Sequence, residues 1–257
     1  MAIADIVNSL FQYMGDQLMA NGAGAHNARY RGKKLGTSVT SDQWAAIQDG
    51  TFKDMYIGDY WEIGGVKWRI ADFDYWLHCG DTECTKHHVV IVPDTTLYSA
   101  KMNNSDTTTG AYTSSVMRTT NLGTAKTTIN NAFGSGHILN HRQLFANAVS
   151  SGNASGWAWT DSTVDLMNEA MVYGSRAWDV ANHNGHDVGI DKGQLSLFRH
   201  DHSRICACDS GGSRAGWWLR GVCSATNFCL VGYNGLASSY GASNSLGVRP
   251  AFGICAA

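Results

Sequence analysis

The sequence predicts an α+β fold in which strands open and close a single domain and helices lie between them. Alternating apolar residues on either side of Gly64-Gly65 indicate an early hairpin over residues 60–70, because glycine readily adopts the positive φ values of a two-residue turn. A Trp-rich stretch near the C-terminus supplies the closing strands. Strands that flank a helical middle in this way are expected to pair with each other.

The first 40 residues are predicted to form an arm, and residues 41–257 a single domain. Apolar side chains recur at helical spacing over residues 3–20, which indicates an amphipathic helix. Such a helix either packs on its own domain or joins like subunits or a larger assembly, and the sequence leaves both interpretations open. The glycine-rich residues 21–37 are interpreted as a connector that crosses a surface.

One buried strand and one short helix are predicted in the first part of the domain. The continuous apolar run over residues 88–92 indicates a strand that is buried on both faces in the middle of a sheet and stops at Pro93. Ser41-Asp42 are expected to cap a short helix that ends near Gly50.

The middle of the chain is predicted to be helical between polar loops. Three helices are expected, over residues 115–133, 141–149 and 162–171. Ser162 is the expected cap of the third helix, because an early acidic residue and an apolar stripe follow it. Residues 102–114 and 179–216 are interpreted as mostly loop.

Composition excludes several classes of protein. The formal charge is 19 − 21 = −2, and the sequence has no basic run. It therefore lacks the clustered positive charge that is typical of proteins that bind nucleic acid or an anionic membrane. Hydrophobic residues at 44% exclude a disordered chain. No Lys or Arg precedes the apolar N-terminal residues, so no secretory signal is expected, and no stretch reaches a membrane-spanning length. Most of the seven cysteines are expected to remain thiols in a reducing cytosol, whereas some could form disulfides outside a cell. The sequence leaves both states open.

Residues 221–248 form a run of 28 residues without a single charged side chain. Thirteen of them are Gly, Ser or Ala, a composition that a flexible linker shares. The run also contains apolar anchors that a solvated linker does not need. These are Val222, Phe228, Leu230, Val231 and Val248. We interpret the run as a pair of short strands carrying long loops, with the chemistry of a paratope: Tyr supplies contact area at low entropic cost, and Ser, Gly and Asn supply adaptable hydrogen bonds.

Eight short blocks of distinctive sequence are distributed over nearly all of the chain after residue 29. They span residues 30–33, 35–40, 57–61, 68–71, 87–94, 166–169, 218–220 and 247–252. In combination they resemble the hypervariable proteins of gut bacteriophages, which are targets of diversity-generating retroelements. Two of the blocks, Trp218-Leu219-Arg220 and Gly247-Val248-Arg249-Pro250, also resemble other C-type-lectin-like proteins, including sulfatase-modifying enzymes.

This resemblance implies a C-type-lectin-like ligand-binding domain over residues 41–257, with a variable C-terminal segment on a strand scaffold. It implies a binding protein and not an enzyme, carried on a phage virion after synthesis in the bacterial host cytoplasm. The expected partners are a host-cell surface molecule, protein or glycan, and copies of the chain or other virion proteins. Nucleic acid, membrane insertion and cofactors are not expected. In such systems a reverse transcriptase copies a template with errors at adenines, so that Asn codons become many other codons.

Twelve residues in or beside the uncharged run are the candidates for ligand contact. They are Trp217, Gly221, Cys223, Thr226, Asn227, Cys229, Tyr233, Asn234, Leu236, Tyr240, Asn244 and Leu246. Tyr233 and Tyr240 are expected to be the main anchors, with small neighbours shaping a pocket. A second group is expected to form the scaffold beneath them. Its members are Trp218, Leu219, Val222, Phe228, Val231, Val248 and Phe252.

Arg220 and Arg249 are the only charged residues close to the run. Burying an unpaired guanidinium is costly in free energy. Each arginine is therefore expected to pair with an acid or to donate to backbone carbonyls rather than to contact a ligand.

Two groupings of cysteine and histidine have the residue types of a metal site. The first consists of Cys79, Cys84, His87 and His88, and its cysteine spacing is looser than in a usual zinc pair, so a loop disulfide or free thiols are preferred. The second consists of Cys206, Cys208, His200 and His202, where a one-residue spacer seldom lets both sulfurs reach one ion. Calcium needs a cluster of acidic oxygens, which the C-terminal third lacks. No metal is predicted.

Two functions of other classes stay open. One is a bacterial sugar-binding lectin, which the missing secretion signal disfavours. The other is a sulfatase-modifying-type oxidase that would use Cys223 and Cys229, although a catalytic pair is not expected within a segment that varies. Asn168-Glu169 suggest hydrolysis only weakly, because no nucleophile–base motif accompanies them.

Overall fold

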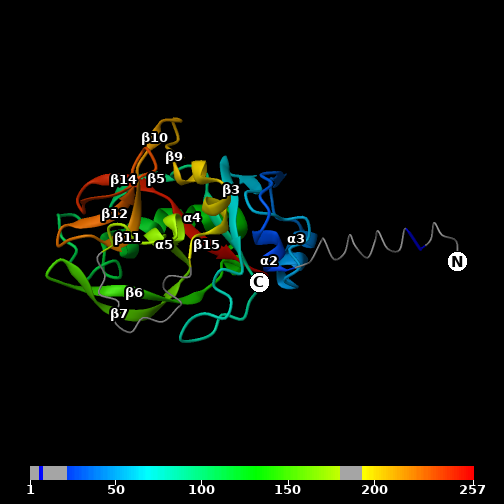
Figure 1. Ribbon diagram of the computed structural model, residues 1–257, viewed down its shortest axis with the longest axis horizontal. Helices are drawn as coiled ribbons and strands as arrows, with labels where there is room; N and C mark the ends of the chain where they lie inside the picture. Colours follow the sequence, from blue (N-terminus) through cyan, green and yellow to red (C-terminus); the bar gives the residue numbers. More distant parts are fainter. Residues whose placement is uncertain (1–5, 8–21, 180–192) are drawn as a thin grey trace.

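The computed structural model describes residues 6–7, 22–179 and 193–257 (Figure 1). Most of the helix expected over residues 3–20 lies outside the described residues, so its role in assembly stays a prediction. The described part is a mixed α+β structure, made mostly of strands in two main sheets with several short helices. The predicted α+β class is confirmed.

The first main sheet has six strands in the order β1-β2-β3-β4-β15-β8. Their bounds are β1 Lys34–Gly36, β2 Tyr60–Ile63, β3 Val66–Phe73, β4 Val89–Pro93, β8 Val164–Leu166 and β15 Pro250–Ile254. The last strand, β15, pairs antiparallel with both β4 and β8. The predicted pairing of opening and closing strands is therefore confirmed.

The predicted hairpin and buried strand are both present in this sheet. Ile63 pairs with Val66 across Gly64 and Gly65, whose φ values are +61° and +77°. Such values suit glycine, because a Cβ atom would be strained there. All five residues of β4 are buried, as expected for a strand in the middle of a covered sheet.

The second main sheet has five strands in the order β13-β12-β11-β14-β5. Their bounds are β5 Tyr98–Lys101, β11 Trp217–Val222, β12 Asn227–Val231, β13 Ala237–Gly241 and β14 Ser245–Val248. Two smaller sheets are the pair β6 His141–Ser150 with β7 Asn153–Ser162, and the pair β9 Ala207–Cys208 with β10 Arg214–Ala215. Figure 1 shows β11, β12 and β14 at one end of the long axis and α2 and α3 toward the other.

The helices are short and cover the sheets. They are α2 Ala23–Asn27, α3 Ser41–Gln48, α4 Leu122–Phe133, α5 Glu169–Tyr173 and α6 Ser196–His200, with a π-helical turn η1 Met117–Asn121 and 3-10 turns η2 Ser135–His137 and η3 His202–Ile205. Helix α3 is confirmed, but its cap is Thr40: Thr40 and Gln43 form a reciprocal capping box one residue earlier than expected. The expected helix over residues 115–133 is confirmed as η1 followed by α4.

Two of the expected helices are wrong in whole or in part. Residues 141–149 form strand β6, which turns into β7 through Ser151 and Gly152, both at positive φ. That turn was not recognised, and the apolar spacing before it suits either structure. Residues 164–166 form β8, and the helix begins later, at Glu169, with Asn168 and not Ser162 as its cap. Pairing with β15 outweighs the local helical pattern there.

An aromatic cluster joins the first sheet to α4. The rings of Trp68, Phe133 and Phe252 lie 5.6–5.7 Å apart, and Trp61 contacts Phe133 edge-on at 6.4 Å. All four side chains are 5% exposed or less. Phe252 was predicted as scaffold, and its burial confirms this.

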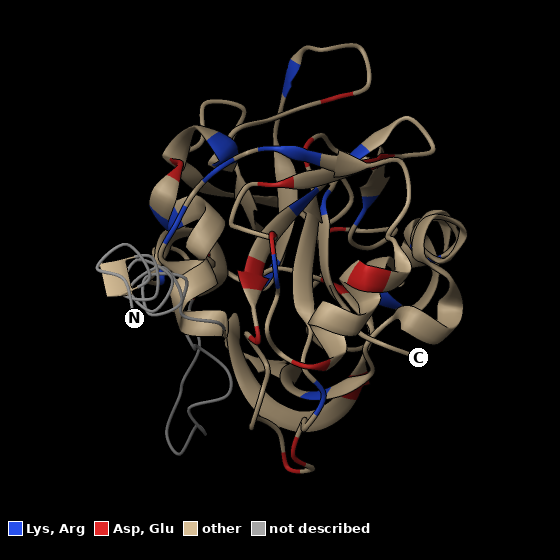
Figure 2. Ribbon diagram, turned by 90° about the vertical axis from the view of Figure 1, so that its right-hand side faces the viewer, with Lys and Arg blue, Asp and Glu red and all other residues tan. Residues whose placement is uncertain are grey.

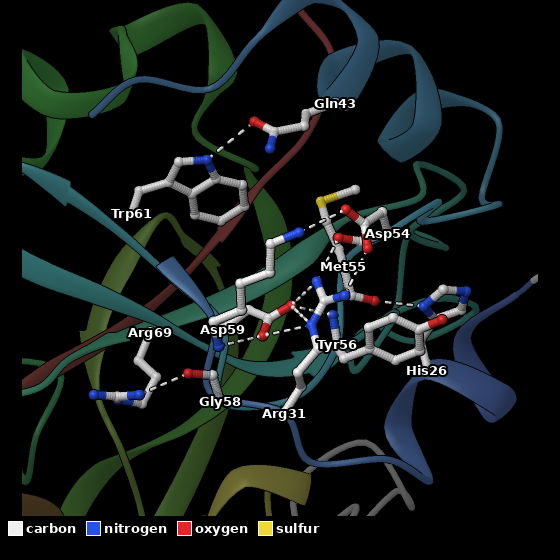
Figure 3. Close-up of polar contacts among 11 residues, drawn as sticks. His26, Arg31, Gln43, Asp54, Met55, Tyr56, Gly58, Asp59, Trp61 and Arg69 are labelled. Atoms are coloured by element: carbon white, nitrogen blue, oxygen red, sulfur yellow. Dashed lines mark hydrogen bonds and ion pairs between the residues drawn. The ribbon is translucent and has the colours of Figure 1, made fainter. Parts of the chain in front are cut away.

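The connector packs on the domain through the buried carboxylate of Asp59 (Figure 3). Asp59 accepts hydrogen bonds from the Arg31 guanidinium at 2.6 and 3.1 Å, from the Lys33 backbone N–H at 2.7 Å and from the Tyr56 backbone N–H at 2.9 Å. The Arg31 guanidinium also reaches Asp54 at 2.6 Å. Strand β1 then runs parallel to β2. Residues 30–36 are thus fixed to the domain, while the predicted boundary at residue 40 stays a prediction.

We expect Asp59→Ala to lower the free energy of unfolding by about 2–4 kcal/mol, because it removes the buried one of the two carboxylates that bind Arg31 and leaves two backbone N–H groups without their acceptor. Urea denaturation measures the loss. The matched control is Glu62→Gln, which removes one partner of the exposed pair with Lys34 and should leave the urea midpoint nearly unchanged. Equal losses for the two variants would contradict a special role for Asp59.

Three stacked rings connect β6 to the first sheet. Trp76 stacks with His88, at 5.7 Å between ring centroids, and with His141, at 4.1 Å. Burial lowers the pKa of His141 to about 3, and the positive potential of His88 and Arg220 adds to the effect. The ring is therefore neutral in the folded protein near neutral pH.

The depressed pKa of His141 predicts a loss of stability in acid. Between pH 6.5 and 3 the unfolded chain binds a proton that the folded chain does not, so the free energy of unfolding falls as pH falls, by about 2 kcal/mol at pH 5 from this group. Burial raises the pKa of Asp72 to about 6, which acts in the opposite direction over pH 4–6. Urea denaturation at pH 7 and pH 5 should therefore compare the parent with His141→Gln. An identical acid loss in both would show that His141 does not titrate in this way.

Candidate ligand-binding surface

The uncharged run contains the end of β11 and all of β12, β13 and β14. The connections between these strands are short. Residues 227–231 are β12, residues 237–241 are β13 and residues 245–248 are β14. Only residues 223–226, 232–236 and 242–244 lie between strands. The expected long loops are therefore wrong: the regular pairing of β12 with β13 over five residue pairs leaves little chain for loops.

The twelve candidate residues fall into three groups by exposure. Thr226, Tyr233, Asn234, Leu236 and Tyr240 are exposed, and Cys223, Asn227, Asn244 and Leu246 are half-buried. Trp217, Gly221 and Cys229 are buried. The predicted scaffold residues Trp218, Leu219, Val222, Phe228, Val231 and Val248 are at most 1% exposed, which confirms their assignment.

The assignment of Trp217, Gly221 and Cys229 to the ligand-contacting group is wrong. Trp217 is fully buried, and its indole N–H donates to the carbonyl of Ile205 at 3.1 Å. A Cβ atom on Gly221 would lie 3.0 Å from the Cys229 Sγ, so the backbone of Gly221 packs tightly against the Cys229 side chain. Strand β11 is buried along its whole length and β12 from Phe228 onward, so both faces of these strands are covered. The sequence of the run gave no indication of this cover.

Trp178 is a surface residue that the sequence analysis missed. Its ring is 50% exposed, and its indole N–H donates to the carbonyl of Ala237 in β13 at 3.2 Å. It lies between the helix expected over residues 162–171 and the loop expected over residues 179–216, and it is 59 residues from Ala237 in sequence. A Trp that follows the end of a predicted helix could have been noted as a candidate surface residue. Nothing in the neighbouring sequence indicates that it would bond to β13.

The carboxylate of Glu169 positions Trp178. Glu169 is fully buried at the start of α5. It accepts backbone N–H groups from three consecutive residues, Ala177, Trp178 and Asp179, at 2.8–3.2 Å. Hydrogen bonds to a charged acceptor are stronger than neutral ones. This buried acid therefore fixes the backbone of residues 177–179.

Four large exposed side chains lie on or beside β13, an edge strand of its sheet. Trp178, Tyr233, Leu236 and Tyr240 are 50–67% exposed, and we call them the β13 surface. Within the described residues the only other exposed large hydrophobic residues are Ile6 and Val7. Exposed apolar groups that lie together commonly mark interaction sites. Elsewhere, charged residues of both signs are scattered over strands and helices rather than gathered in one patch (Figure 2).

The loop over residues 102–114 supports the turns of the uncharged run through main-chain atoms. The Thr108 hydroxyl donates to the Ser224 carbonyl at 2.8 Å, and the Thr108 backbone N–H donates to the Ala225 carbonyl at 3.0 Å. The Asn103 N–H donates to the Ala242 carbonyl at 2.9 Å, and Asp106 accepts the Ser243 N–H at 2.8 Å.

The third turn is held in the same way, by the Tyr173 hydroxyl, which donates to the Gly235 carbonyl at 3.0 Å. Together with the bond from Trp178 to Ala237, these contacts all end on the main chain of the run. Within the run, the side chains of Ser224, Asn234 and Asn244 also bond main-chain atoms of the turns.

Both arginines beside the run donate to backbone carbonyls, as expected. Arg220 donates to the Leu166 carbonyl at 3.0 Å and lies over the Phe145 ring. Arg249 donates to the carbonyls of Pro93 at 2.9 Å and Arg204 at 2.8 Å. Burial lowers the pKa of Arg249 to about 10, which still leaves it charged at neutral pH.

The proposed cysteine–histidine groupings do not come together as metal sites. His87 bonds Asp74 at 2.8 Å, and His88 bonds the Lys86 carbonyl at 2.9 Å. No group of three or more His, Cys, Asp or Glu side chains suited to a metal ion occurs in residues 6–7, 22–179 and 193–257. Among the same residues no helix has the length and apolar character to cross a membrane.

Residues 172–255 match the family model described as a domain of unknown function, DUF6273. This match begins in α5 and ends after β15, so it contains Trp178 and the whole uncharged run. No curated protein and no solved structure matches the chain.

The separation of exposed and buried groups predicts how variants behave. We expect the double variant Tyr233→Ser/Tyr240→Ser to keep the free energy of unfolding within about 1 kcal/mol of the parent. Trp218→Ala should lose about 3–5 kcal/mol, because its buried ring leaves a cavity and the Ala100 carbonyl loses a hydrogen bond of 2.9 Å. Urea denaturation of the parent and both variants measures these free energies of unfolding. A double variant as unstable as Trp218→Ala would place the tyrosines in the core.

Proposed function

We propose that this protein is a binding protein that presents the β13 surface, with the neighbouring exposed residues Thr226 and Asn234, to a ligand. The half-buried Cys223, Asn227, Asn244 and Leu246 shape the border of this surface. Binding rather than catalysis is the proposed activity. The ligand is a host-cell surface molecule, protein or glycan.

One observation carries this proposal: the uncharged run is fixed by bonds to its main chain, while its largest exposed side chains make no part of the core. Hydrogen bonds from Thr108, Tyr173 and Trp178 end on backbone carbonyls, which every residue type has. A surface built in this way tolerates changes at its large exposed positions, Tyr233, Leu236 and Tyr240. Loops and edges on a rigid frame are where proteins most readily change what they bind.

We further propose that the domain has a C-type-lectin-like fold and that a diversity-generating retroelement diversifies the run. The sequence blocks that resemble hypervariable phage proteins support this, and so do the burial of the scaffold residues and the neutral, Tyr-containing surface. On this proposal the protein belongs to a phage virion. Helices α2 and α3 lie toward the opposite end of the long axis from β11, β12 and β14, which suits attachment at one end and presentation at the other (Figure 1).

We also propose that the protein acts as an oligomer, joined to copies of itself or to other virion proteins. A surface of four apolar side chains and small polar neighbours supplies limited affinity to each copy. Several copies on one particle multiply the overall affinity when their spacing fits the target.

A binding experiment on intact cells tests the proposed activity. Fluorescently labelled protein is mixed with a panel of gut bacterial isolates, and bound label is measured by flow cytometry. The parent should stain at least one isolate, and Tyr233→Ser/Tyr240→Ser should lower that staining about tenfold or more, since central aromatic anchors carry much of a binding energy. Lys53→Ser, at an exposed position in the connection between α3 and β2, is the matched control and should stain like the parent. Equal staining by the double variant would exclude the β13 surface as the binding site.

The proposed diversification has a separate test in the DNA around the gene. A near-identical repeat of the codons for residues 217–246, differing where the repeat carries adenine, should lie beside a reverse-transcriptase gene. Absence of both would contradict the retroelement and leave the binding activity untouched.

A second candidate function is the sulfatase-modifying-type oxidase. The observation that favours it is the contact between the sulfurs of Cys223 and Cys229, which lie 2.6 Å apart. Oxidation of a cysteine-containing peptide that requires copper and is lost in Cys223→Ser would support the enzyme.

A further inference from the structure

We propose that Cys223 and Cys229 are a redox modification site, which small-molecule disulfides convert to a disulfide bond across the end of the β11–β12 hairpin. This inference goes beyond the proposed function and does not depend on any ligand of the β13 surface.

The geometry of the hairpin brings the two sulfurs together. Val222 of β11 pairs with Phe228 of β12, and the Cys223 N–H donates to the Asn227 carbonyl at 2.9 Å. The two Sγ atoms lie 2.6 Å apart. All seven cysteines belong to the described residues, and within that set no other pair of sulfurs is in contact. Cys223 and Cys229 are therefore the pair positioned to form a disulfide bond.

The surroundings of the pair keep the two sulfurs in place. Cys229 is fully buried, and a side chain on Gly221 would press against its Sγ. The connection over residues 223–226 is tied to Thr108 through the carbonyls of Ser224 and Ala225. Burial of Cys229 and the bonds that tie residues 223–226 to Thr108 limit the motion of the pair, so part of the cost of ordering the two sulfurs is met by folding.

The different exposure of the two sulfurs assigns their roles. Cys223 is half-buried and can meet a reagent from solvent, whereas Cys229 cannot. The Cys223 thiolate attacks one sulfur of oxidised glutathione, forming a mixed disulfide and releasing one glutathione thiolate. The Cys229 thiolate then attacks the Cys223 sulfur and releases the second. The two protons lost by the cysteines are taken up by the two glutathiones: the protein dithiol is oxidised and one glutathione disulfide is reduced to two thiols.

This chemistry ties the border of the β13 surface to the redox state of its surroundings. The glutathione pool of a cytosol favours the dithiol, while an oxidising exterior favours the disulfide. The bond would close the short connection that carries Thr226 and restrict its motion. Cys223 and Cys229 would then be fixed structural residues inside an otherwise changeable run.

Alkylation and mass spectrometry test the site on the full chain. Reduced protein is incubated with oxidised glutathione, unfolded, alkylated and digested with trypsin, which cleaves after Arg220. The peptide that begins at Gly221 should lose two alkylatable thiols and become lighter by two hydrogens, with fragment ions placing the bond between Cys223 and Cys229. Cys206→Ser/Cys208→Ser is the matched control and should give the same result.

Two single variants keep the assignment of roles falsifiable. Cys229→Ser should retain one glutathione on Cys223, because no second thiol is present to release it. Cys223→Ser should acquire no glutathione on Cys229. Alkylation of both cysteines in the parent after oxidation, or a bond from either to another cysteine, would overturn the proposal, and glutathione on Cys229 in Cys223→Ser would overturn the order of attack.

Discussion

The shape of the uncharged run depends on hydrogen bonds that reach its main chain from elsewhere in the protein. Thr108, Asn103 and Asp106 come from one loop, and Tyr173 and Trp178 come from the segment after β8. A run rich in Gly and Ser loses much conformational entropy when it folds, and small side chains bury little apolar area in return. Support of the backbone from outside the run offsets much of that missing contribution, and the side chains of Ser224, Asn234 and Asn244 add to it within the turns.

Buried charged residues hold the backbone segments that support the uncharged run, whereas the β13 surface itself carries no charged side chain. Glu169 binds three consecutive N–H groups and so places Trp178, while Arg249, between β14 and β15, donates to the carbonyls of Pro93 in β4 and Arg204 in η3. Asp59 does the same for the connector. Backbone groups bond each of these buried ions, and Asp59 is also paired with the Arg31 guanidinium, which makes the charges tolerable in a low-dielectric interior. The β13 surface is left neutral, and a neutral aromatic surface places few electrostatic limits on the ligands that it accepts.

The two main sheets give this arrangement its rigidity. Strand β15 follows β14 directly but belongs to the other sheet, where it lies between β4 and β8. The end of the uncharged run is therefore continuous with the most buried strands of the domain. Motion of β14 relative to the first sheet would have to break pairing on both sides of β15, which makes the frame beneath β11–β14 stiff.

The sequence by itself determined the elements whose signals are local. The Gly64-Gly65 hairpin, the buried strand β4, the apolar scaffold of the run and its lack of charge were all readable, because turn chemistry and apolar runs act over a few residues. The tertiary structure decided which side of each strand faces outward, and it moved Trp217, Gly221 and Cys229 inside. It also brought Trp178 to β13, Thr108 to Ser224 and the Cys223 sulfur to that of Cys229. These outcomes depend on strand register and on partners as many as 116 residues apart, and no local pattern encodes a distance of that kind.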